Sequence, residues 1–351
     1  MKEFIAFDSH KRYTLMERED IKTGKTVQLR IEHAHGAILG CLRGRQPGTP
    51  VAVEATGNWY WIVDEIELAG LQPKLVHPRK AKLMMGMINK TDKLDVHGFN
   101  RLQRNGTLPT VWIPPRELRD QREITRGRMV MASHRTRLKN RIQSTLSKYG
   151  WAGTDASDPY GKKARVQLIE GIEQLPPETS QMTAALLKQL DFIQDQIDET
   201  EKRIRRLVQD TPEMDLLRTL PGIGWILAAV VGLEIGEIGR FASAERYASY
   251  SGTTPRVHAS GDKMRFGRLR PDVNRYLKWA YVEAAHSVCL QRRMIPLRHV
   301  SRLYERIRKR KGHPKAIGAV ARHLAEATFH VLTRGEPYRD PVIKEGRSRE
   351  V

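Results

Sequence analysis

The spacing of apolar residues divides the chain into a first part with strand and helix patterns and a longer part with helical patterns. In the first part, short apolar runs or alternating β-branched residues predict strands at 4–7, 14–18, 26–31, 51–53 and 73–76. Helical patterns at 33–42 and 59–69 lie between them. Alternating strands and helices favour a mixed α/β sheet that carries helices on its faces.

The middle of the chain is helical and basic. Few helix breakers interrupt residues 116–149, and a second helical stretch follows the Gly/Asp/Pro-rich segment 150–161 and continues to about Gln209. Within this stretch, apolar positions step by three and four residues at Leu190, Ile193, Ile197, Thr200, Ile204 and Leu207. This heptad spacing predicts a seam that needs a partner helix, either in a hairpin of the same chain or in an intermolecular coiled coil.

The third part begins at Leu216 and contains a Pro-Gly-Ile-Gly turn between two apolar helical patterns. This order is typical of a helix-hairpin-helix unit, which offers backbone N–H groups to a nucleic-acid phosphate at the start of its second helix. Gly222 and Gly224 are therefore candidate nucleic-acid contacts. A turn that only packs two helices together is the alternative.

The net positive charge of the chain indicates which class of molecule it binds. The 351 residues include 61 Lys and Arg against 40 Asp and Glu, a formal charge of +21, which favours binding to nucleic acid.

The longest apolar run, 226–233, is too short to span a bilayer, and the first residues lack a signal-peptide core, so we expect a cytoplasmic protein. The two cysteines, Cys41 and Cys289, lack metal-site spacing, and we expect reduced, structural thiols.

Four carboxylates are placed at the ends of predicted elements in this basic chain. Asp8 and Glu54 follow predicted strands, and Asp92 and Asp95 are three residues apart at the start of a predicted helix, which puts both on one helical face. Mg²⁺ prefers oxygen ligands, and metal-assisted phosphoryl transfer uses acids from separate elements. Taken singly, Asp8 could be a turn residue, Asp92 a helix N-cap and Asp95 a solvated residue.

The order of motifs resembles one family. The matching segments are FIAFD at 4–8, VEATG at 53–57, NKTDKLD at 89–95, LPGIG at 220–224, Arg240-Phe241, ASYSGTTP at 248–255 and ASG at 259–261. Together they are similar to insertion-sequence transposases that carry an N-terminal DEDD domain of RuvC-like (RNase H-like) fold and a C-terminal catalytic-serine domain. The resemblance covers nearly the whole chain.

The resemblance implies an α/β plus α architecture: a RuvC-like domain at 1–115, a basic helical and coiled-coil region at 116–210, and a mostly helical serine transposase domain at 211–351. It also implies an RNA-guided recombinase, in which an element-encoded bridge RNA pairs with donor and target DNA and strands are exchanged through a covalent phosphoserine. Mg²⁺ at Asp8, Glu54, Asp92 and Asp95, a tetramer and a nucleoid-associated location belong to the same expectation. The alternatives are a DEDD endonuclease or junction resolvase that hydrolyses DNA without an adduct, and a non-catalytic nucleic-acid-binding protein.

Ser260 matches the family's nucleophile, with Ser243, Ser249 and Ser251 as nearby competitors. The Ser-Gly pair favours Ser260, because a neighbour without a Cβ lets a phosphate approach closely. A serine hydroxyl needs activation, for which Mg²⁺ or His258 are the candidates.

Basic residues with interleaved aromatic residues surround this serine and are expected to contact nucleic acid: Arg256, Lys263, Arg265, Arg268, Arg270, Arg275 and Lys278. The chain departs from the family where a Lys-x-Gly-Asn is usual, since 270–274 keeps only Asn274. Two further basic strips, at 116–141 and 302–315, are each candidates for binding guide RNA.

Overall fold

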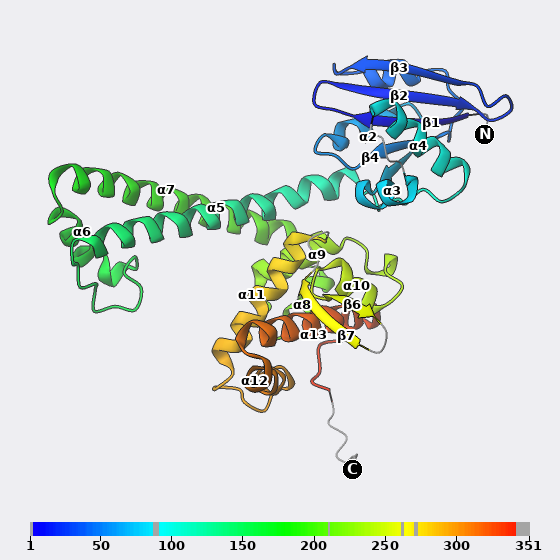
Figure 1. Ribbon diagram of the computed structural model, residues 1–351. Helices are drawn as coiled ribbons and strands as arrows, with labels where there is room; N and C mark the ends of the chain where they lie inside the picture. Colours follow the sequence, from blue (N-terminus) through cyan, green and yellow to red (C-terminus); the bar gives the residue numbers. More distant parts are fainter. Residues whose placement is uncertain (1–2, 87–90, 210, 261–262, 270–272, 342–351) are drawn as a thin grey trace, which may run out of the picture. The chain divides into compact units, whose positions relative to one another are not determined.

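The computed structural model describes residues 3–86, 91–209, 211–260, 263–269 and 273–341 (Figure 1). The chain forms two compact units, Met1–Arg116 and Glu117–Val351, and each is treated separately below. Within the described ranges, every helix is too short or too polar to cross a membrane. Cys41 and Cys289 are both free thiols, as expected.

Unit 1 is built on a five-stranded sheet in the order β3-β2-β1-β4-β5. Strands β1 (Glu3–Ser9), β2 (Tyr13–Asp20) and β3 (Thr26–Glu32) form an antiparallel meander. Strands β4 (Pro50–Glu54) and β5 (Gln72–Val76) continue the sheet in parallel from β1. The predicted mixed sheet and its meander are confirmed.

Helices cover both faces of this sheet, and strand alternation decides which residues meet them. On one face, α1 (Ala37–Leu42) and α2 (Trp59–Leu68) pack over large side chains such as Ile5 and Phe7. On the other face, α3 (Pro78–Met85) and α4 (Asp92–Arg104) pack over the small Ala6 and Ala52. The small residues leave room for α4 to lie close to β1, where the Gln103 side chain donates to the backbone oxygen of Ile5 at 2.8 Å.

The helix predicted at 33–42 begins only at Ala37. Gly36 precedes it with a left-handed φ of 81°, a backbone conformation that ends the loop before the helix. The buried Glu65 carboxylate accepts hydrogen bonds from the backbone N–H groups of Gly36 at 2.6 Å and Leu39 at 3.0 Å. A side chain from α2 therefore fixes the start of α1, which sequence spacing does not show.

Unit 2 contains a long helical hairpin made by α5 (Arg116–Lys148) and α7 (Pro177–Val208), with η1 (Lys162–Ala164) and α6 (Arg165–Glu173) in the connection. The second helical stretch is thus two helices, separated at Pro176-Pro177. Half of the predicted seam is buried, at Leu190, Ile197 and Ile204, and Leu190 packs with buried residues of α5 within the chain. Leu207, the last predicted position, is exposed, and its neighbour Val208 is buried instead. Two polar contacts join the helices: Arg128 donates to Glu201 at 2.7 Å and Arg135 to Gln194 at 2.9 Å. The intramolecular alternative therefore describes this seam.

The rest of unit 2 packs around one apolar core. Its elements are α8 (Pro212–Arg218), α9 (Trp225–Ile235), η2 (Ile238–Arg240), α10 (Ala244–Tyr250), the hairpin of β6 (Pro255–Ser260) and β7 (Lys263–Leu269), α11 (Arg275–Gln291), α12 (His299–Lys311) and α13 (His313–Arg334). The remainder of the chain after unit 1 is mostly helical, as predicted.

A fully buried carboxylate ties the long helix α5 to this core. Glu234 on α9 is 0% exposed, and Arg126 of α5 donates to its two oxygens at 2.7 and 3.1 Å. Asn274 donates to Glu234 Oε2 at 2.8 Å, and its own Oδ1 caps α11 by accepting from the N–H groups of Tyr276 and Leu277. Arginines of α5 therefore compensate the charge of Glu234, and the start of α11 adds a hydrogen bond.

The Pro-Gly-Ile-Gly turn connects α8 to α9, and its first glycine is a packing residue. Gly222 has φ 77°, and a Cβ there would lie 2.4 Å from the backbone oxygen of Ala284 on α11. Gly224 is the exposed N-cap of α9, and nothing lies within 4 Å of a Cβ built on it. Gly222 is therefore required for close packing against α11, whereas Gly224 is not, and this difference is not visible in the sequence.

Alanine substitutions at Gly222 and Gly224 test whether the turn needs glycine for close packing against α11 or only for its backbone conformation. We expect Gly222→Ala to lower the free energy of unfolding by at least about 2 kcal/mol, because it adds left-handed strain to a backbone clash. Gly224→Ala, the matched control, is expected to cost less than about 1 kcal/mol, the scale of a weakened helix cap. Thermal unfolding of both variants measures the difference, and equal melting temperatures would contradict the packing role of Gly222.

Glu234 offers a second test of stability. Glu234→Ala removes the carboxylate that faces the buried guanidinium of Arg122 at 3.8 Å and binds the half-buried Arg126, and we expect a loss of about 3–5 kcal/mol in the free energy of unfolding. Glu237→Ala, an exposed carboxylate three residues later, is the control and should change stability by less than about 0.5 kcal/mol. Urea unfolding monitored by circular dichroism checks both. A loss below about 1 kcal/mol for Glu234→Ala would show that the pair does not hold the unit together.

Candidate active site

The four predicted carboxylates line one cavity in unit 1. The cavity has a volume of about 450 Å³ and is lined by Asp8, Ser9, His10, Glu54, Thr56, Pro78, Arg79, Lys82, Met85, Asp92, Asp95 and Phe99. Its residues come from the end of β1, the end of β4, α3 and the start of α4. Acids that are far apart in the sequence are thus brought together at one end of the sheet.

Strand alternation explains the direction of the first two acids. Asp8 is two residues after Ala6, and Glu54 is two residues after Ala52, so both acids are on the face that α3 and α4 cover. Asp8 does not follow its strand, as the sequence indicated, but lies within it. Strand β1 continues to Ser9 because β2 pairs with it throughout, with Asp8 opposite Leu15.

Helix α4 brings the other two acids to the same place. Asp92 and Asp95 occupy its first turn, each four residues before a buried residue of the apolar stripe, Val96 and Phe99. The apolar stripe faces the sheet. The two half-buried carboxylates lie on the same side of the helix, one turn earlier, and line the cavity. Thr91 is the N-cap, with its hydroxyl accepting from the N–H of Leu94 at 3.3 Å, so the N-cap alternative for Asp92 is wrong.

His10 belongs to the cavity and was missed in the sequence. Its Nε2 lies 3.2 Å from Oδ2 of Asp8 and 3.2 Å from Oδ2 of Asp92. Tyr13 donates its hydroxyl to the same Asp92 oxygen at 3.2 Å. The signal available in the sequence was the Asp-Ser-His order, which places a histidine two residues after an acid at the end of a strand.

The electrostatics of the cavity favour a bound cation. Burial raises the pKa of the Asp8 carboxyl above its usual value; the neighbouring charge of His10 opposes this, while Asp92 and Asp95 raise it further. Asp8, His10 and Asp92 form a possible metal-binding cluster, since their ligand atoms all lie within 4.8 Å of one another. His10 Nε2 is buried and has no hydrogen-bond partner among the described residues. Two carboxylate oxygens and an imidazole nitrogen within 4.8 Å of one another fit a divalent cation.

Ser260 lies in unit 2, at the exposed end of β6, where its backbone pairs with Lys263 of β7. Of the four candidate serines, all of which are described, only Ser260 is exposed. Ser251 is buried and donates to the backbone oxygen of Ala248 at 3.0 Å. Ser243 caps α10, where it accepts from the N–H of Arg246 at 3.3 Å. Ser249 is half-buried on α10.

The base of this hairpin is fixed to the core of unit 2. The N–H of Asn274 donates to the backbone oxygen of Tyr250 at 3.0 Å, which joins the chain before β6 to the chain after β7. Gly252 has φ 71°, and a Cβ there would lie 2.5 Å from the side chain of Val273. Asn274, the residue that the chain keeps from the family's pattern, thus connects the hairpin, α11 and Glu234.

The predicted basic contacts near Ser260 are partly described. Arg256, Arg265 and Arg275 are exposed, and Lys278 is half-buried on α11. The side chains of His258, Lys263 and Arg268, and all of Gly261 and Arg270, lie outside the described residues. The described cations leave a basic surface around the hairpin.

The two basic strips differ once they are folded. On α5, Arg119 and Arg122 are buried, while Arg126 and Arg128 bind carboxylates, so the first half of this strip does not form a free basic surface. On and after α12, exposed cations persist at Arg302, Arg306, Arg308, Lys309, Arg310, Lys311 and Lys315. The α12 strip is therefore the better candidate for phosphate contacts.

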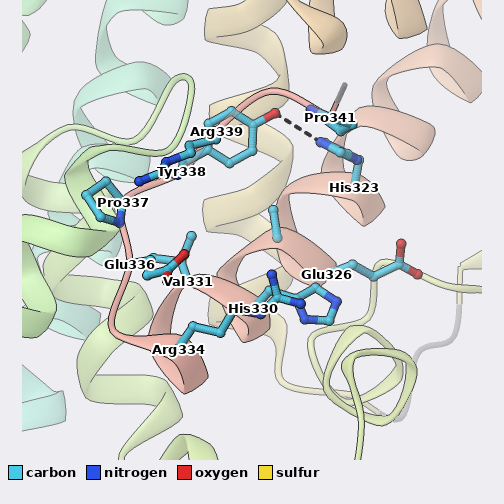
Figure 2. A pocket seen from close by; sticks show the side chains of 11 residues that line it. His323, Glu326, His330, Val331, Arg334, Glu336, Pro337, Tyr338, Arg339 and Pro341 are labelled. Atoms are coloured by element: carbon cyan, nitrogen blue, oxygen red, sulfur yellow. Dashed lines mark hydrogen bonds between the residues drawn. The ribbon is translucent and has the colours of Figure 1, made fainter. Parts of the chain in front are cut away.

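A second cavity, of about 480 Å³, lies in unit 2 between α13 and the segment that follows it (Figure 2). Tyr338 and His323 are 3.2 Å apart across it, between the hydroxyl and Nε2. Burial lowers the pKa of His323, and the charge of His299 lowers it further. Its described lining mixes Glu326 and Glu336 with cationic residues and contains no predicted site residue.

The sequence is similar to that of known transposases. Residues 214–299 match the family model "Transposase IS116/IS110/IS902 family". The chain is 25% identical to a "Probable family 20 transposase" of Pseudomonas aeruginosa, over 69% of this chain and 72% of that protein. It is 22% identical to the "Transposase for insertion sequence element IS1111A" of Coxiella burnetii, over 82% of this chain and 79% of the relative.

A "Pilin gene-inverting protein" of Moraxella bovis is 28% identical over 41% of this chain and 45% of its own length. The matched segment 214–299 contains α9, the serine hairpin and α11. Residues 214–299 are therefore similar to the transposase domain of the IS116/IS110/IS902 family, and most of the chain is similar to insertion-sequence transposases.

Proposed function

We propose that this protein is a DNA transposase that cuts and exchanges strands of donor and target DNA through a covalent phosphoserine. The observation that carries the proposal is the convergence of Asp8, Glu54, Asp92 and Asp95 on one cavity, in a chain whose second unit contains a transposase domain with an exposed serine. Acids gathered in this way in a strongly basic protein are suited to chemistry on phosphodiesters.

We further propose that unit 1 is a RuvC-like (RNase H-like) domain. In support, its sheet has a three-stranded antiparallel meander followed by two parallel strands, in the order β3-β2-β1-β4-β5. The acids come from the first strand, the fourth strand and the start of a helix packed on that sheet. A fold of this kind positions the acids on rigid elements, which catalytic geometry requires.

The cavity residues have distinct tasks in this proposal. Asp8, Glu54, Asp92 and Asp95 would hold Mg²⁺, which supplies stabilisation of the negative charge that develops on the reacting phosphate. Tyr13 orients Asp92 by its hydrogen bond. Arg79 and Lys82, both exposed and both lining the cavity, place positive charge where a DNA backbone would enter.

The serine performs the covalent step. The Ser260 oxygen forms a bond to phosphorus, its proton leaves to a base, and the bond from phosphorus to a deoxyribose oxygen breaks. A hydroxyl of the new DNA partner then attacks the phosphoserine and frees the serine, so the number of phosphodiester bonds is conserved. His258, two residues earlier, is a candidate base, and exposed Arg256, Arg265 and Arg275 neutralise the backbone charge.

Two further features of the proposed mechanism follow from the family resemblance. They are an element-encoded guide RNA that pairs with donor and target DNA, and a tetramer in which the acids of one subunit act with the serine of another. The exposed cations of the α12 strip support a role in holding folded RNA, which is read largely through its phosphates and shape.

The metal centre is tested by removing one charge. We expect Asp8→Asn to weaken Mg²⁺ binding by at least about tenfold and to abolish DNA strand transfer, because a ligand in the buried part of the cavity is lost. Glu32→Gln, an exposed carboxylate on β3, serves as the control and should change neither. Calorimetric titration with Mg²⁺ measures the binding. Unchanged Mg²⁺ affinity in Asp8→Asn would mean that the acids are structural.

The nucleophile is tested with end-labelled donor and target DNA, the element's RNA and Mg²⁺, followed by a denaturing gel. We expect wild-type protein to form a covalent protein–DNA adduct, and Ser260→Ala to form none while it retains RNA binding. Ser243→Ala, which removes only a helix cap, should retain the adduct.

Two other results would contradict the proposal. An adduct that persists in Ser260→Ala would place the nucleophile elsewhere. Cleaved DNA without any adduct in the wild type would instead identify a hydrolytic DEDD endonuclease.

A further inference from the structure

His10 stands at the centre of the acidic cavity, although it is not one of the four acids. It follows β1 directly, and its Nε2 lies 3.2 Å from one oxygen each of Asp8 and Asp92. Both contacts are at ion-pair distance, and the buried nitrogen makes no hydrogen bond among the described residues. A buried polar atom left in this way costs free energy unless something else binds it.

The backbone and the ring of His10 are held in place by neighbours outside the acids. Asn58 donates to the His10 carbonyl oxygen at 2.8 Å, and Thr56 donates to the Asn58 side chain at 2.8 Å. The ring packs against Tyr13, with 4.6 Å between centroids. Tyr13 also donates to Asp92, so one residue positions both the histidine and the acid beside it. Such supporting contacts are typical of groups around a metal ligand.

The separations match those of ligands on one cation. Two ligands at right angles on an ion, each about 2.1–2.2 Å from it, are about 3 Å apart. The separations from His10 Nε2 to the two carboxylate oxygens are both 3.2 Å, and the three ligand atoms lie within 4.8 Å of one another. The nitrogen therefore occupies the position of a third ligand next to Asp8 and Asp92.

We propose that His10 is a nitrogen ligand of the metal centre, which makes the centre a mixed nitrogen and oxygen site that prefers Mn²⁺ to Mg²⁺. This inference rests on the metal site of the proposed function and adds to its ligands. Mg²⁺ favours oxygen ligands and gives up its water reluctantly, whereas imidazole is a better ligand for transition metals. The same cavity without His10 would offer carboxylates alone and lose the preference.

The test uses the full-length protein loaded with Mn²⁺ and pulsed electron paramagnetic resonance, which detects a directly bound ¹⁴N nucleus. We expect wild type to show ¹⁴N coupling of a coordinated imidazole and His10→Ala to lose it. Calorimetry should show that His10→Ala weakens Mn²⁺ binding by at least about tenfold and Mg²⁺ binding by less than about threefold. Circular dichroism confirms that the variant is folded.

His97→Ala is the matched control, because His97 lies on α4 near the acids but pairs with Glu17 outside the cavity lining. It should retain the ¹⁴N coupling and both affinities. Coupling that persists in His10→Ala, or equal losses for the two metals, would overturn the inference. Mn²⁺ binding that requires Asp8 but shows no ¹⁴N coupling in wild type would overturn the role of His10 and leave the metal centre. An absence of Mn²⁺ and Mg²⁺ binding in wild type would overturn both.

Discussion

The burial of acidic side chains gathered at one end of a sheet is the constraint around which unit 1 is organised. Burial is the main cause that raises the pKa of Asp8; the charge of His10 lowers this pKa, and repulsion from Asp92 and Asp95 raises it further. Two apolar layers hold the acids in place, one on each face of the sheet. A cation would relieve the repulsion, so the fold pre-organises a binding site at the expense of local stability.

In unit 2, the buried carboxylate of Glu234 is paired with side chains of the same unit. Glu234 has no exposure, yet Arg126 and Asn274 satisfy both of its oxygens. Asn274 also caps α11 and holds the base of the serine hairpin through the backbone of Tyr250. Asn274 thus links the long helix α5 to the hairpin that carries Ser260. The base of the hairpin is thus held by hydrogen bonds, while Ser260 at the end of β6 is exposed.

The parts that the sequence predicted are those governed by local patterns. Alternation predicted the strands, and heptad spacing predicted the half of the α7 seam that is buried. The motif order singled out four acids that line one cavity. Contacts between distant residues escaped prediction. His10 joins the acids only when β1 and α4 meet, the start of α1 depends on Glu65 of α2, and the space beside Gly222 depends on α11. Contacts of the same kind decide how much of the basic strip on α5 is exposed, since Glu234 and Glu201 pair with two of its arginines, Arg126 and Arg128.

The central claim is that a cation held by the carboxylates of unit 1 is required for the covalent step at Ser260. The most direct measurement is the yield of protein–DNA adduct as Mg²⁺ is titrated into metal-free wild type and Asp8→Asn. The account predicts no adduct without Mg²⁺, a yield that saturates with the Mg²⁺ affinity measured by calorimetry, and none in Asp8→Asn at any of these concentrations. The same adduct yield in metal-free protein, or in Asp8→Asn, would contradict it.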